Sequence, residues 1–317
     1  MSARRALLPL GLAVGFGLVA PAPSHAGPWS LDRGQYASEL IGSWYSAYTY
    51  HDPNGDRARL VGGGHMERRA IEWMSEFGWK KRVSIVFGLP YESVSRQPDG
   101  SPSPELRSAS GFGDGIVGFK YNFANRRSAA ALEVDATFPA YAYTPYAPPK
   151  AGPDYNVLEQ THDPVHGDGA GSVAGVLHVG TGLGHSGFVQ GYGGYRQRFR
   201  DFKPQVLAGA DLGFWLGNTW MIGGSYHGEI AGSSASDLAN VVPGGPSGDN
   251  PTADATRHLA GPILLLRVDD RLDVFASTMH TVTAENALHT DEVRFGFRFK
   301  QTQLDRTQGF LGTSRRP

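Results

Sequence analysis

The stretch Glu292-Val-Arg-Phe-Gly-Phe-Arg-Phe-Lys300 alternates between apolar and charged side chains. One set of alternate positions holds Val293, Phe295, Phe297 and Phe299, and the other set holds Glu292, Arg294, Arg298 and Lys300. Because successive side chains of a β-strand point to opposite faces, this pattern predicts a strand with one apolar and one charged face. The charged face requires a polar environment of its own.

The same alternation recurs at 117–123, 130–138, 206–216 and 220–230. A soluble β-sandwich also alternates, but repeated strands of about ten residues with charge on the second face are typical of a transmembrane barrel. We therefore expect an all-β fold, a closed antiparallel transmembrane β-barrel of about twelve strands. The expected strands lie near 35–50, 59–74, 82–91, 112–123, 128–139, 171–183, 187–199, 204–216, 219–231, 257–268, 271–284 and 291–300.

The links between these strands fall into two classes by parity. The short links are 76–81, 124–127, 184–186, 217–218 and 269–270, and the long ones include 96–110, 141–170 and 232–256. Outer-membrane barrels place short turns in the periplasm and long loops outside the cell. The parity thus predicts an even number of strands with both chain ends on the periplasmic side.

The N-terminus has the features of a secretory signal peptide. Arg4 and Arg5 precede the apolar stretch Leu7–Ala20, and Ser24-His25-Ala26 offers small residues at a cleavage site. A transmembrane anchor is the alternative, but this stretch is shorter than the ~20 residues that spanning requires. We expect a signal peptide at 1–26, a barrel at 27–300 and a polar tail at 301–317 that assembly does not require.

Composition excludes two other classes of protein. The mean hydropathy of −0.31 is too low for a bundle of transmembrane helices. Without Arg4 and Arg5, 27 of the 29 basic residues remain against 30 acidic ones, so nothing favours nucleic-acid binding. The expected location is the cell outer membrane. The expected partners are outer-membrane lipid, a small-molecule solute and the barrel-assembly machinery during biogenesis.

Three segments carry a family resemblance: Trp29–Tyr36, Glu76–Tyr91 with its Leu-Pro-Tyr end, and the Gly-Phe-Gly-Asp strand Gly111–Phe123. Together they resemble the outer-membrane proteins named for the meta-pathway of phenol degradation, with Phe77 where that family often has tyrosine. The resemblance covers about Trp29–Phe138 and is only architectural beyond it. It implies a twelve-stranded barrel that takes up aromatic or other hydrophobic molecules, and it supplies no catalytic residues.

The polar face of the strands should line the lumen. The side chains expected there are Glu39, Lys120, Glu133, Asp135, Asp211, His227, Glu229, Asp273, Arg294 and Arg298. A twelve-stranded barrel is narrower than a general porin, so we expect a constricted passage that favours cations or neutral solutes. Tyr141, Tyr143 and Tyr146 are expected at its outer mouth. The alternative is a sealed structural or adhesive barrel, recognised by a lumen without a continuous water path.

Three motifs suggest other chemistry. Gly182–Gly187 matches a dinucleotide fingerprint, but a Gly- and Tyr-rich stretch follows where that fingerprint needs a helix, so a hairpin turn is favoured. His162–Asp168 could hold a metal ion, although Pro164 argues against a helix there. His185-Ser186 are adjacent on a turn and point apart. We therefore expect no enzyme, metal or cofactor. The enzymatic alternative is a lipid-modifying hydrolase, recognised by a Ser or His converging with a carboxylate on the outer wall.

Overall fold

The computed structural model describes eleven stretches of the chain: 28–29, 31–52, 54–60, 64–97, 107–125, 128–140, 171–184, 186–199, 203–232, 255–285 and 287–301. The expected signal peptide, the segment 162–168, the tyrosines 141, 143 and 146, and the tail after Gln301 lie outside these residues. All regular secondary structure within the described stretches is β-strand. No helix among the described residues has the length and apolarity needed to cross a membrane.

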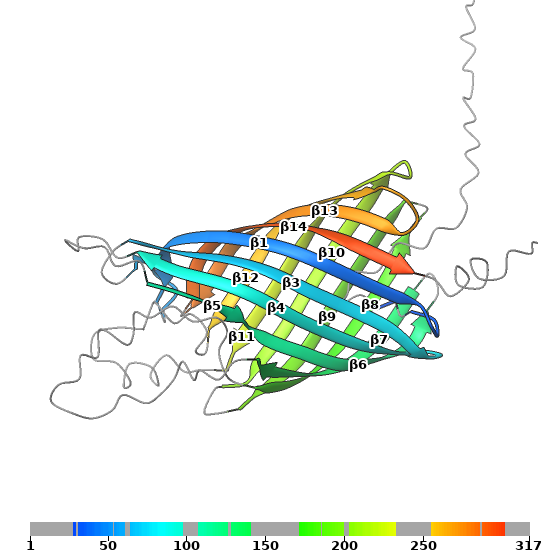
Figure 1. Ribbon diagram of the computed structural model, residues 1–317, viewed down its shortest axis with the longest axis horizontal. Coiled ribbons are helices and arrows are strands. Elements are labelled where there is room, and N and C mark those ends of the chain that lie inside the picture. The colour runs from blue at the N-terminus through cyan, green and yellow to red at the C-terminus, as the bar shows by residue number, and fades with distance from the viewer. Residues whose placement is uncertain are drawn as a thin grey trace, which may run out of the picture.

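Twelve strands form a closed antiparallel barrel, which confirms the expected fold (Figure 1). Each strand pairs with its neighbours in the chain, and the last strand pairs with the first from Tyr36↔Gln301 to His51↔Ala287. The short strands β2 (Arg57–Arg59) and β5 (Arg107–Phe112) pair with β1 and β4 beyond this ring. The barrel strands are β1 (Tyr36–His51), β3 (His65–Lys80), β4 (Val83–Gln97), β6 (Asp114–Asn125), β7 (Ser128–Pro139), β8 (Ser172–Leu183), β9 (Gly187–Arg198), β10 (Gln205–Leu216), β11 (Trp220–Ala231), β12 (Thr256–Arg267), β13 (Leu272–Glu285) and β14 (Ala287–Gln301).

The barrel has two different ends. The turn end carries both ends of the strand series and the links β3–β4, β6–β7, β8–β9, β10–β11 and β12–β13, and the opposite, loop end carries the others. Gly182–Gly187 spans the β8–β9 hairpin, with Gly184 at φ 65°, so the hairpin interpretation is confirmed. The strands β6 to β12 have 12 residues each, whereas β1, β3, β4, β13 and β14 have 14 to 16.

Three sequence-based boundaries were wrong. The second barrel strand was expected at 59–74 and lies at 65–80, so the expected turn 76–81 is reduced to Lys81 and Arg82. The outward charges Glu67 and Arg69 break the alternation there and conceal the strand. The β13–β14 link is residue 286 alone, whereas the expected strands left 285–290 between them. The β5 strand lies partly inside an expected loop, 96–110.

The two faces of the wall separate as predicted. Phe295 is 58% exposed and Phe119 is 54% exposed on the outer face. The other predicted outward side chains, Leu132, Phe138, Leu212 and Phe297, are exposed as well. The aromatic side chains of Trp44, Tyr48, Trp79, Tyr121 and Trp220 are also exposed. An apolar exterior on a ring without free strand edges suits a hydrocarbon environment, where unpaired backbone groups are costly.

Candidate functional site in the barrel lumen

All ten side chains predicted for the lumen occupy inward positions of their strands. The structure groups them into separate contacts rather than one cluster. Arg298 bonds Glu39 across the β14–β1 seam, Lys300 bonds Asp273 and Lys120 lies opposite Glu133. Asp211 joins His227 through Ser225, whereas Asp135 lines neither of the two chambers described below.

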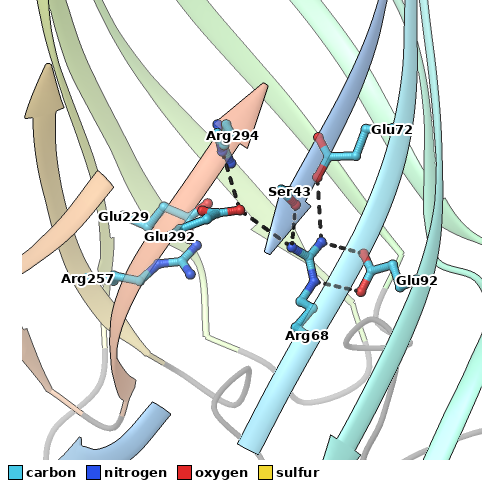
Figure 2. Close-up of polar contacts among 8 residues, drawn as sticks. All are labelled: Ser43, Arg68, Glu72, Glu92, Glu229, Arg257, Glu292 and Arg294. Atoms are coloured by element: carbon cyan, nitrogen blue, oxygen red, sulfur yellow. Dashed lines mark hydrogen bonds and ion pairs between the residues drawn. The ribbon is translucent and has the colours of Figure 1, made fainter. Parts of the chain in front are cut away.

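The loop-end half of the lumen holds a polar chamber of about 380 Å³. At its centre Arg68 makes two parallel hydrogen bonds to Glu92, Nε–Oε2 at 2.9 Å and Nη2–Oε1 at 2.8 Å (Figure 2). The same guanidinium lies 3.5 Å from Glu72 and 3.7 Å from Glu292. Bidentate pairing fixes a guanidinium in one orientation, so Arg68 ties β3 to β4 and reaches β14 across β1.

A second set of ion pairs lines another side of this polar chamber. Glu229 lies 3.3 Å from Arg257 and 3.4 Å from Arg196, so it bridges β12 and β9. Arg294 lies 3.3 Å from Glu292, which links this side to Arg68 (Figure 2). Basic and acidic side chains therefore alternate around the polar chamber.

On the turn-end side of the polar chamber lies an apolar chamber of about 370 Å³. Glu72 and Arg294 line both chambers and mark the boundary between them. The apolar side chains of its wall are Ile41, Met74, Ile116, Phe188, Trp215, Met221, Ile263, Leu265, Phe275 and Met279. A cavity of this size and lining suits a small ligand with a mainly apolar body.

One part of the apolar chamber's wall is polar. Ser225 donates to Asp211 and its hydroxyl lies 2.8 Å from His227 Nε2, while Tyr192 OH lies 2.9 Å from His227 Nδ1. Gln190 Nε2 donates to the other Asp211 oxygen at 2.7 Å. Five side chains from β9, β10 and β11 thus form one chain of hydrogen bonds, which we call the Asp211 cluster.

A glycine makes room for this cluster. A Cβ built at Gly209 would lie 2.2 Å from the ring of Tyr192, which is closer than real contacts allow. The ring therefore covers the bare backbone of β10, between the imidazoles of His178 and His227 at centroid distances of 5.9 and 6.0 Å. Any larger residue at 209 would displace Tyr192 from its bond to His227.

The segment before β1 enters the turn end of the lumen. Trp29 is 6% exposed and meets Phe188 edge-to-face, with 6.4 Å between ring centroids. Its carbonyl accepts from Lys120 Nζ at 3.3 Å, and Asn122 donates to the Pro28 carbonyl. Trp29 shares a buried cluster with Phe188, Met221 and Leu265, three side chains of the apolar chamber's wall, so its indole packs against that wall at the turn end. We call Pro28 and Trp29 the Trp29 plug.

Several charged side chains in the turn-end half of the barrel, one of them Lys120 at the plug, line neither of the two chambers. Lys120 is fully buried and bonds Glu76, also buried. Asp273 is equally buried and lies against Lys300 and, at 3.6 Å, Arg267. Burying an ion removes its hydration, so each charge here depends on its partner.

The residues that a hydrolase requires do not meet in the described part of the chain. Ser225 and His227 are within hydrogen-bond distance, but Asp211 bonds the serine. In a catalytic triad the carboxylate instead bonds the imidazole nitrogen that faces away from the serine. On the outer wall His280 Nδ1 lies 2.8 Å from Asp291, and among the described residues no serine makes a hydrogen bond to that imidazole. No group of three or more described His, Cys, Asp or Glu side chains could hold a metal ion.

Sequence reasoning missed Trp29, Arg68, Glu72, Glu92, Arg196 and Tyr192. Trp29 precedes the first strand, so no alternation reports on it. Arg196 and Tyr192 share an inward face whose opposite face holds Gly191 and Gly193, and glycine hides the apolar half of the pattern. Counting in steps of two from Phe188 would have found both.

No family model matches the sequence, and no curated protein matches it. Among solved structures, the COG4313 outer membrane channel from Pseudomonas putida F1 is similar over 87% of this chain and 98% of that one, at 12% identity and TM-score 0.59. The translocator domain of autotransporter NalP from Neisseria meningitidis covers 85% and 89%, at 9% identity and TM-score 0.48. The Pseudomonas putida toluene transporter TodX covers 86% and 91%, at 5% identity and TM-score 0.40. At these identities, the first likeness supports the barrel fold alone, and the other two carry no argument.

Proposed function

We propose that this protein is an outer-membrane channel that admits small hydrophobic or aromatic molecules. In this proposal the loop end faces outside the cell and the turn end faces the periplasm, as in other barrels with short periplasmic turns. The resemblance to the family named for the meta-pathway of phenol degradation and the similarity to a solved outer-membrane channel agree with this class.

The observation that carries the proposal is the apolar chamber inside the lumen. Hydrophilic channels keep a polar, water-filled lumen. Here Phe188, Trp215 and Phe275 face inward instead, in a space of about 370 Å³. Transfer of apolar surface out of water stabilises a ligand in such a space by about 25 cal/mol per Å². A hydrophobic solute would therefore concentrate there before release toward the periplasm.

Filling the chamber tests the proposal. Ile263→Trp replaces a small side chain in the chamber wall with a bulky indole. Leu264→Trp places the same indole on the outer face of the same strand. With refolded protein in lipid vesicles, we expect Ile263→Trp to abolish the uptake of ethylbenzene and Leu264→Trp to leave it intact. Both variants should first show the heat-modifiable migration of a folded barrel.

Equal uptake by the two variants would remove the chamber from the route. Uptake by the wild type no faster than by empty vesicles would overturn the channel proposal. It would favour the sealed barrel, for which the Trp29 plug and the packed charges at the turn end are the supporting observation.

A further inference from the structure

The hydroxyl hydrogens of Tyr192 and Ser225 and the ring hydrogen of His227 point along one path toward Asp211. Ser225 donates its one hydroxyl hydrogen to the carboxylate, so it can only accept from His227 Nε2. In a neutral imidazole Nδ1 then has no hydrogen and must accept from Tyr192 OH. This order follows from the acceptor-only chemistry of a carboxylate.

The cluster therefore offers acceptors to the apolar chamber. The hydroxyl hydrogens of Tyr192 and Ser225 and the ring hydrogen of His227 are used within the cluster. The Tyr192 oxygen keeps lone pairs, and each Asp211 oxygen accepts one hydrogen bond from the cluster although it can accept more. A ligand group that meets this wall must bring its own hydrogen.

The charges around the apolar chamber also favour a cationic ligand group. Asp211 accepts only from the neutral donors Ser225 and Gln190, and no Arg or Lys of the described chain lies within 4.0 Å of it in an ion pair. The two arginines lining the chamber face acidic partners, Arg298 with Glu39 and Arg294 with Glu292. Among the chamber's carboxylates Glu39 and Glu72 each have an arginine, so Asp211 is the one whose negative charge lacks a cation.

We propose that the apolar chamber is a subsite for hydrophobic amines, with Asp211 and Tyr192 receiving the ammonium group and the apolar wall receiving the hydrocarbon body. This inference rests on the proposed function and names the chemical class of its solute. An ammonium brings three donors and a positive charge, whereas a hydroxyl brings one donor and a carboxylate brings none. The chamber should rank these head groups in that order.

A series of ligands with one hydrocarbon body tests the ranking. The probes are 2-phenylethylamine, 2-phenylethanol, phenylacetate and, without a head group, ethylbenzene. Binding is measured by titration calorimetry to the full mature chain in lipid nanodiscs, with empty nanodiscs subtracted. We expect the amine to bind about tenfold more tightly than the alcohol, since hydrogen bonds to charged groups exceed neutral ones by about this factor. Phenylacetate should bind most weakly.

Two variants assign the preference to its residue. Asp211→Asn keeps the shape and removes the charge, so the amine should lose about tenfold in affinity while ethylbenzene is unchanged. Asp291→Asn, the matched change on the outer wall, should alter neither. Equal affinity for amine, alcohol and carboxylate in the wild type would overturn the amine subsite, and that comparison needs no variant. An amine preference that survives in a folded Asp211→Asn barrel would overturn it too.

The ethylbenzene measurements distinguish a failure of the proposed function from a failure of the amine subsite. If ethylbenzene is neither bound nor taken up, the chamber does not serve hydrophobic solutes and both proposals fall. If ethylbenzene binds and the head groups are not distinguished, only the amine subsite falls.

Discussion

The polar chamber at the loop end and the packed turn end are built by the same strands, yet their charged side chains differ in environment. In the polar chamber the charges face a cavity, whereas at the turn end Lys120 and Asp273 are fully buried. Along β9 the inward side chains run from Arg196 through Tyr192 to Phe188, and along β11 from Glu229 through His227 to Met221. Along these two strands polarity thus falls from the polar chamber to the apolar chamber. The alternation of a strand decides which face is inside, and the gradient along the inward face decides what that interior can hold.

The largest expected difference between the regions concerns stability. Lys120→Met leaves Glu76 buried without its cation, so the free energy of unfolding should fall by about 3–5 kcal/mol. The matched change Arg68→Met lies beside a chamber of about 380 Å³ that water can occupy. It should cost less, about 1 kcal/mol, because water can solvate the remaining carboxylates. Urea unfolding of the refolded barrels measures both, and equal losses would contradict the comparison.

The second prediction concerns the Trp29 plug. Trp29→Ala removes an indole that fills part of the lumen at the turn end, so the ion conductance in planar bilayers should rise several-fold. Gly180→Val should act similarly, because a Cβ there would lie 2.7 Å from Pro28 and 2.9 Å from Trp29. The control is Trp79→Ala, whose indole lies on the outer face. Unchanged conductance in both plug variants would place the constriction elsewhere.

A smaller effect is expected from charge in the polar chamber. Arg196 is one of four arginines lining it, and its neutralisation leaves Glu229 with Arg257 alone. Arg196→Gln should shift the reversal potential in a salt gradient toward greater cation preference, because lumen charges set the local ion concentration. A shift toward anions would show that Arg196 does not face the conducting path.

The smallest effect is expected from Glu133 and Asp135, which line neither chamber. Glu133 lies 3.3 Å from His178 Nε2 and is opposite Lys120 in register, away from both chambers. Neutralising both carboxylates should lower the cation preference slightly and leave stability nearly unchanged. A shift larger than that of Arg196→Gln would reverse the assigned importance of the two regions.

The sequence was sufficient for the wall of the barrel and insufficient for its contents. Alternation placed Phe295 outside and Arg294 inside because a strand allows only two directions. Pairing between inward side chains depends on register across neighbouring strands, which alternation does not report. Arg68 and Glu92, for example, come together because the register of β3 and β4 sets Arg68 opposite Val94, two residues from Glu92. The Trp29 plug is a tertiary contact of a segment without periodicity, so no local pattern could have revealed it.

The contact between Tyr192 and Gly209 also bears on how relatives of this chain can be recognised. An aromatic ring that covers a glycine on the next strand links two positions, because a side chain at 209 requires a smaller one at 192. Paired substitutions of this kind remain detectable when overall identity is too low to align two barrels by sequence. A glycine on one strand facing a tyrosine on its neighbour, with histidine and serine one strand further, is a pattern by which genomes could be searched for barrels with the same chamber.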